Sequence, residues 1–137
     1  MKYLHLSLFL VISSVFFAQA QPKAKKEAQP PLKFTVLEIE RQNIPYGSED
    51  LFVFEFKNTS KKAAVITNVQ TSCGCTAAER PETPIRKGKK GVIKVHYDTK
   101  RVGGFTKTIT VFSNVGDPIV LTIKGSVLSP SDSPVTN

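Results

Sequence analysis

The sequence predicts an all-β protein: an immunoglobulin-like β-sandwich of about seven strands, preceded by a signal peptide and a short tether. Three observations indicate this fold class. The segment Leu51–Lys57 alternates between apolar and polar residues, as a half-buried strand does. Further short strand-like runs are separated by turns rich in Gly, Pro, Asn and Asp. No stretch has apolar residues at helical spacing. A small β-barrel would produce a similar pattern and is the alternative.

The first twenty residues have the organisation of a signal peptide. Lys2 provides a positive start, Tyr3–Phe17 is mostly apolar, and Ala18-Gln19-Ala20 places small residues at the positions that signal peptidase recognises. The apolar run is broken by polar residues and is shorter than the roughly 17–25 residues that a membrane span needs. We therefore expect export to the periplasm or the extracellular space, with residues 1–20 removed and no transmembrane span left. An uncleaved anchor is the alternative.

The remaining chain divides into a tether, one domain and a tail. Residues 21–31 contain three lysines and three prolines without apolar periodicity, which indicates an extended, solvated tether. Residues 32–128 are long enough for one domain of ordinary size. Residues 129–137 are a polar tail.

The first half of the domain contains three expected strands. They are Phe34–Glu40, Leu51–Lys57 and Ala64–Thr71, separated by a loop at 42–50 and a turn at 58–62. The second of these places Phe52, Phe54 and Phe56 on one face, where they form part of the main core. The third has the adjacent apolar residues Val65 and Ile66, so it needs a β-bulge to keep one face buried.

The second half contains three longer strands and a weaker one. Residues 77–90 hold two prolines and a glycine and are expected to form only a short edge strand. Gly91–Tyr97 and Phe105–Ser113 alternate, and a last strand is marked by the inward-facing residues Ile119, Leu121 and Ile123.

Cys73 and Cys75 are the only cysteines, and Gly74 lies between them. In an extended strand their Cα atoms would be about 6.6–6.8 Å apart. A disulfide prefers about 5.5–6 Å, so the pair can join comfortably only if Gly74 bends the chain. Three roles remain open: shaping a loop as thiols or a local disulfide, exchanging electrons with another dithiol, or binding a soft metal with help from His96. The first is favoured.

Enzymatic activity is not expected. His96 is the only histidine outside the signal peptide, and the alternation of its strand directs it outward beside Lys94. The carboxylates are scattered, and the chain lacks a glycine-rich phosphate loop or a carboxylate metal motif. We therefore expect no catalytic residues and no cofactor.

The chain is basic, with a formal net charge of +8. Outside the cytoplasm the available anions are envelope lipids and polymers, so nucleic acid is not an expected partner. If successive strands alternate in direction, two basic turns share one pole with the end of the tether, and that pole could face an anionic envelope surface. The alternative is an ordinary solvated surface. The candidate anion-binding residues are Lys61, Lys62, Arg86, Lys87, Lys89 and Lys90.

An ordered set of motifs resembles a bacterial family, domain of unknown function 1573. The motifs are F-x-F-x-N-T (54–59), V-x-T-S-C-G-C-T (69–76), P-I-x-x-G (84–88), G-x-I-x-V-x-Y-D-T (91–99), G-x-x-K-x-I-x-V-x-S-N (104–114) and L-x-I-x-G-x-V (121–127). The resemblance implies an exported immunoglobulin-like sandwich and supplies no established activity. We therefore expect an exported, non-catalytic binding or structural module of the bacterial envelope, whose partner is an envelope protein or an anionic surface. A thiol–disulfide or soft-metal-handling protein centred on Cys73 and Cys75 is the alternative.

Overall fold

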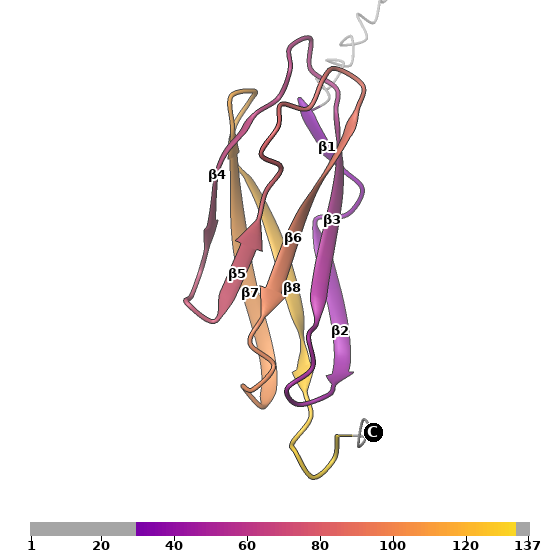
Figure 1. Cartoon of the computed structure of the whole chain (residues 1–137), viewed down its shortest axis with the longest axis vertical. Coiled ribbons are helices and arrows are strands. Elements are labelled where there is room, and N and C mark those ends of the chain that lie inside the picture. Colours follow the sequence, from indigo (N-terminus) through magenta and orange to yellow (C-terminus); the bar gives the residue numbers. More distant parts are fainter. Residues whose placement is uncertain (1–29, 134–137) are drawn as a thin grey trace, which may run out of the picture.

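Two four-stranded sheets pack face to face in the computed structural model, which describes residues 30–133 (Figure 1). The first sheet has the order β1-β3-β6-β5, with bounds Leu32–Phe34, Leu51–Asn58, Lys90–Tyr97 and Thr76–Glu79. The second sheet has the order β2-β8-β7-β4, with bounds Glu38–Ile44, Ile119–Val127, Gly103–Ser113 and Ile66–Thr71. This arrangement confirms the expected all-β sandwich. No helix within these residues is long and apolar enough to cross a membrane.

The strands run between two poles of the sandwich. β2 pairs with β8 in parallel, and all other strand pairs are antiparallel. At the upper pole of Figure 1 lie the β3–β4 loop, the β5–β6 loop and the β7–β8 turn, beside the start of β1. At the lower pole lie the β2–β3, β4–β5 and β6–β7 connections. We call the upper end the basic pole and the lower end the cysteine pole.

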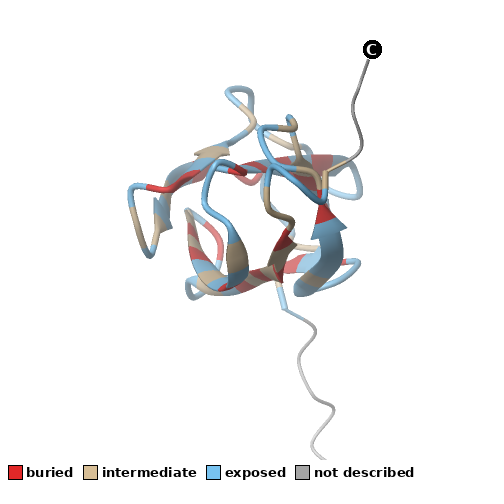
Figure 2. Ribbon diagram, turned by 90° about the horizontal axis from the view of Figure 1, so that it is seen from below, coloured by how far each residue is buried: buried red, intermediate tan, exposed pale blue. Residues whose placement is uncertain are grey.

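The core lies between the sheets. Phe52, Phe54 and Phe56 are at most 1% exposed, as their alternation predicts. The second sheet contributes residues that are equally buried: Ile109, Val111, Leu121 and Ile123. Figure 2 shows buried and exposed residues alternating along the strands that surround this interior. Because each alternating strand turns one row of side chains inward, the two sheets bury a continuous apolar layer.

The expected first strand is in fact two strands in different sheets. Phe34 lies in β1, where its ring centroid is 5.2 Å from that of Phe56. The chain then crosses to the second sheet, where the Leu37 carbonyl accepts a hydrogen bond from Thr122. β2 continues to Ile44, into the segment expected to be a loop, and its pairing with β8 is irregular between Arg41 and Ile44. The chain therefore forms eight strands within residues 30–133.

The expected strand from Ala64 also begins differently. β4 starts at Ile66, and its register shifts between Ile66 and Asn68, which confirms the expected irregularity. Ala64 instead forms an isolated bridge with Ile85. The short edge strand expected after the cysteines is β5.

Several expectations fall on other parts of the chain. The signal peptide at residues 1–20, residues 21–29 of the tether and residues 134–137 of the tail lie outside the described residues. The described beginning of the tail is folded back: the Ser133 hydroxyl accepts a hydrogen bond of 2.7 Å from the Tyr46 amide.

Candidate functional site

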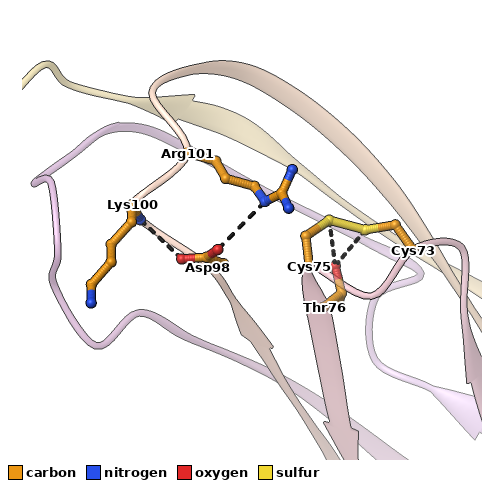
Figure 3. Close-up of polar contacts among 6 residues, drawn as sticks. All are labelled: Cys73, Cys75, Thr76, Asp98, Lys100 and Arg101. Atoms are coloured by element: carbon orange, nitrogen blue, oxygen red, sulfur yellow. Dashed lines mark hydrogen bonds and ion pairs between the residues drawn. A yellow bond between two sulfur atoms is a disulfide. The ribbon is translucent and has the colours of Figure 1, made fainter.

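Cys73 and Cys75 form a disulfide at the cysteine pole (Figure 3). Their Cα atoms are 5.3 Å apart, shorter than an extended strand would place them. A turn through Gly74 achieves this approach, and the Thr76 amide closes it with a hydrogen bond to the Cys73 carbonyl. The local geometry that a disulfide requires is therefore built by the glycine between the two cysteines.

The two sulfur atoms have different surroundings. Cys75 is 9% exposed and belongs to the core, whereas Cys73 is half-buried. The hydroxyl of the buried Thr76 lies 3.6 Å from the Cys73 sulfur and 3.8 Å from the Cys75 sulfur. A thiol acting on this bond would therefore reach the Cys73 side more easily.

The β6–β7 loop lies against the disulfide turn. The Asp98 amide donates a hydrogen bond of 3.0 Å to the Cys75 carbonyl. The Asp98 carboxylate in turn pairs with Arg101 at 3.4 Å and accepts from the Lys100 amide at 3.2 Å (Figure 3). These contacts join two loops of the cysteine pole that lie more than twenty residues apart in sequence.

His96 is not part of the disulfide turn. Its ring lies 3.2 Å from the Glu79 carboxylate on the outer face of the first sheet. Within residues 30–133, no group of three or more His, Cys, Asp and Glu side chains is arranged to hold a metal ion. Because both cysteines are joined in the disulfide, metal binding by their thiolates would first require reduction.

The candidate anion-binding residues come together at the basic pole. Lys61 and Lys62 lie in the β3–β4 loop, while Arg86, Lys87 and Lys89 lie in the β5–β6 loop. Lys90 is the first residue of β6, and all six residues are exposed.

Asn58 holds these two loops together. Its side chain is fully buried, and its amide donates to the carbonyls of Lys62 at 2.7 Å and Ile85 at 2.8 Å. Its carbonyl oxygen accepts from the Ser60 amide at 2.9 Å. Its main chain also pairs with Gly88 and Lys89. Asn58 thus satisfies its own polar atoms and sets the spacing of the cationic loops.

The described chain begins at the same pole. Thr59 donates from its amide to the Pro31 carbonyl at 2.9 Å and from its hydroxyl to the Pro30 carbonyl at 2.7 Å. Gly116 of the β7–β8 turn packs so closely on Pro31 that an added Cβ would lie 2.5 Å from the ring. The last two residues of the expected tether, Pro30 and Pro31, are therefore bound to the domain directly beside the cationic loops.

The basic pole carries fewer carboxylates than basic side chains: Glu82 lies in the β5–β6 loop, Asp117 in the β7–β8 turn, and Glu55 on β3 beside Lys90. Lys90 pairs with Glu55 at 3.4 Å, and both side chains are mostly exposed. Within residues 30–133, the other five candidate residues have no carboxylate within ion-pair distance. The pole therefore carries an excess of positive charge.

Two further lysines adjoin this surface and were not among the residues chosen from the sequence. In the first sheet, Lys33 is directly opposite Lys57, and Lys57 is directly opposite Lys90. All three are exposed and form a row across β1, β3 and β6. The alternation of β3 showed that Lys57 points outward, but no local pattern indicates which residues face it on neighbouring strands.

The fold is shared with solved structures of low sequence identity, which show the fold alone. A protein of unknown function from Porphyromonas gingivalis W83 is 13% identical with a TM-score of 0.61, covering 70% of this chain and 46% of its own. The VesB protease of Vibrio cholerae is 11% identical with a TM-score of 0.60, covering 71% of this chain and 32% of its own. The chain thus spans less than half the length of either protein.

A single-domain structure matches over nearly its whole length. It is an ASH/PapD-like domain of human CEP192, 7% identical with a TM-score of 0.58, and the match covers 80% of this chain and 96% of that domain. No curated protein sequence matches the chain. One family model, described as "Protein of unknown function (DUF1573)", matches residues 32–127, from the start of β1 to the end of β8. The chain belongs to the DUF1573 family.

Proposed function

We propose that this domain is an exported, non-catalytic binding module whose basic pole binds an anionic surface of the bacterial envelope. The observation that carries the proposal is the meeting of two cationic loops beside the first described residues of the chain. Six exposed basic side chains gather there with one carboxylate partner among the described residues. Clustered like charges repel one another, and a nearby anionic surface converts that repulsion into attraction.

The strength of such binding follows from the number of charges. Each lysine or arginine near an anionic membrane surface contributes about 1 kcal/mol at physiological salt. Six basic side chains minus the three carboxylates Glu55, Glu82 and Asp117 leave a net charge of +3. The total is then about 3 kcal/mol, which corresponds to a dissociation constant of roughly several millimolar. The lysines at 23, 25 and 26 add to this charge in sequence. Binding of this kind is weak and reversible and falls steeply with salt.

The test is binding of the exported protein to vesicles that contain the anionic lipid phosphatidylglycerol. The variant Lys61→Gln/Lys62→Gln/Lys87→Gln removes three charges from the basic pole. The matched control Lys100→Gln/Arg101→Gln/Lys107→Gln removes three charges outside the basic pole, two from the β6–β7 connection and one from β7. We expect the pole variant to lower the binding constant at least tenfold and the control to change it less than threefold. Binding that does not respond to salt, or equal losses in both variants, would refute the proposal.

A second candidate function is thiol–disulfide exchange at the cysteine pole. The half-buried Cys73 sulfur, in a bond that closes a very small ring, supports it. A dithiol partner would supply two electrons and two protons: its thiolate attacks Cys73, and its second thiol then closes the partner's own disulfide, leaving both cysteines as thiols. In the reverse direction of the same exchange, the single Cys73 thiol of Cys75→Ser attacks the disulfide of the oxidised partner. Without Cys75 to complete the exchange, part of the partner should be held as a mixed disulfide in envelope extracts. Failure to trap any protein, together with resistance of the wild-type bond to millimolar dithiol, would exclude this function.

A further inference from the structure

The structure brings three lysines into one row on the outer face of the first sheet. Residues directly opposite each other on neighbouring strands have Cβ atoms about 4.5–5.5 Å apart. Lys57 has Lys33 opposite it on one side and Lys90 on the other. Three flexible side chains that begin this close can direct their ammonium groups to a single point. Without an anion there, the same closeness is unfavourable, because like charges in opposite positions repel.

We propose that Lys33, Lys57 and Lys90 bind a phosphate monoester group. The site adjoins the basic pole and shares Lys90 with it. Binding of a phosphate group that is part of an envelope surface therefore rests on the proposed function. Binding of a free phosphate group depends only on the arrangement of the three lysines.

The charge of the row matches such a group. Three lysines carry three positive charges, and Glu55, which pairs with Lys90 at 3.4 Å, returns one negative charge. The remaining two charges equal those of a phosphate monoester, which carries about −1.5 to −2 at neutral pH. A phosphate diester carries only one negative charge and leaves half of this excess uncompensated.

The shape of the surface also suits the ligand. A pocket of about 370 Å³ is lined by the three lysines, Glu55 and Thr35, beside Phe34 and Phe56. The amide of Thr35 donates to the Glu55 carbonyl at 2.9 Å and holds the rim of the pocket against β3. Thr35 is exposed and lines this pocket, so its hydroxyl can donate a hydrogen bond to a phosphate oxygen. Because the site is open to water, we expect a dissociation constant of roughly a millimolar for a single phosphate.

The first test is titration with inorganic phosphate, at constant ionic strength, followed by amide NMR signals of Lys33, Lys57 and Lys90. We expect saturable shifts at pH 7.5 that weaken at pH 5.5, where phosphate is a monoanion. Lys33→Gln/Lys57→Gln should weaken binding about tenfold, and Glu55→Gln should tighten it about threefold. The control Lys94→Gln/Lys107→Gln should leave it within about twofold. Shifts that do not saturate, that dimethyl phosphate reproduces, or that survive Lys33→Gln/Lys57→Gln would overturn the proposal.

The second test separates the sources of the phosphate group. Vesicles containing phosphatidic acid, a monoester, are compared with phosphatidylglycerol vesicles, a diester, at equal surface charge. If a lipid is the source, Lys33→Gln/Lys57→Gln abolishes a preference for phosphatidic acid but keeps salt-dependent binding to phosphatidylglycerol. If free phosphate is the source, inorganic phosphate binds and this preference is absent. If wild-type protein does not bind phosphatidylglycerol vesicles, the proposed function is refuted. Whether Lys33, Lys57 and Lys90 bind a phosphate group is decided separately, by the titration with inorganic phosphate.

Discussion

The side-chain amide of Asn58 donates a hydrogen bond of 2.8 Å to the main-chain carbonyl of Ile85, twenty-seven residues further along the chain. The same amide donates to the carbonyl of Lys62, so one buried side chain fixes the spacing of the two loops that carry the basic pole. Because Asn58 is buried, water cannot take the place of its amide when these hydrogen bonds are lost, and the two carbonyls would remain unsatisfied.

Replacing Asn58 with alanine should therefore be costly. Asn58→Ala leaves the two carbonyls without their donor, and we expect a loss of about 2–4 kcal/mol in the free energy of unfolding, measured by urea denaturation. Asn114 is the matched control, since it also bridges two main-chain groups, of Ala63 and Val65, but is exposed. Asn114→Ala should cost about 1 kcal/mol or less. Equal losses in the two variants would contradict this account.

Gly125 allows β2 to approach β8. It lies opposite Arg41 in the parallel pairing, and a Cβ at this position would overlap the Arg41 carbonyl oxygen. Because the clash is with main chain, a side-chain rotation cannot relieve it. We expect Gly125→Ala to destabilise the fold by more than about 2 kcal/mol and to increase hydrogen exchange in β2.

Gly104 provides the control for that substitution. A Cβ there would meet its nearest atom at 3.9 Å, an ordinary contact. Gly104→Ala should change stability by less than about 0.5 kcal/mol. If both alanine variants behave alike, the close approach at Gly125 does not limit the pairing.

The disulfide should contribute little through chain entropy. The loop between Cys73 and Cys75 is so short that its closure accounts for about 1.5 kcal/mol at most. Reductant alone should therefore lower the melting temperature of wild type only modestly. A large fall in melting temperature on reduction would contradict this prediction and show that the disulfide contributes substantially to the stability of the fold.

Replacing the cysteines separates the bond from its packing. Cys73→Ser/Cys75→Ser places a hydroxyl where the 9%-exposed Cys75 packs in the core, so we expect a loss of about 1–3 kcal/mol. Cys73→Ala/Cys75→Ala avoids the polar atom and should cost less. Thermal melts of both variants beside reduced wild type give the comparison, and a serine variant as stable as the alanine variant would be inconsistent with burial of Cys75.

The pKa of Glu40 is lowered, first by a hydrogen bond of 2.8 Å from the Gln42 amide and next by Lys124 at 3.3 Å. A carboxyl whose pKa is lowered on folding stabilises the fold above its unfolded pKa. This contribution is lost as the pH falls through the folded value. Gln42→Ala should raise the Glu40 pKa toward its ordinary value in an NMR titration of the carboxyl carbon. The control Gln70→Ala changes a residue of β4 in the same sheet and should leave the Glu40 pKa as it is. If Gln42→Ala also leaves the Glu40 pKa unchanged, the hydrogen bond from Gln42 is not the main cause of the lowered pKa.

Export should remove residues 1–20. The apolar run and the Ala18-Gln19-Ala20 site predict a mature protein that begins at Gln21. Intact-mass analysis of protein isolated from its native host provides the measurement. A product that retains Met1 would refute the prediction.

The sequence alone determined the fold class and the longest strands. Along β3 and β6, apolar and polar residues alternate with the period of the strand itself, so burial can be read from neighbouring residues. The need for a bend at Gly74 was also local, because it follows from the reach of two cysteines separated by one residue.

Only the tertiary structure decided what lies across a strand. The division of the first expected strand between two sheets depends on Phe34 packing on Phe56 and on the Leu37 carbonyl meeting Thr122. The lysine row depends on the order β1-β3-β6, and the role of Asn58 depends on a loop twenty-seven residues away. Main-chain pairing brings together residues that are distant in sequence, and the period of a single strand contains no information about its neighbours.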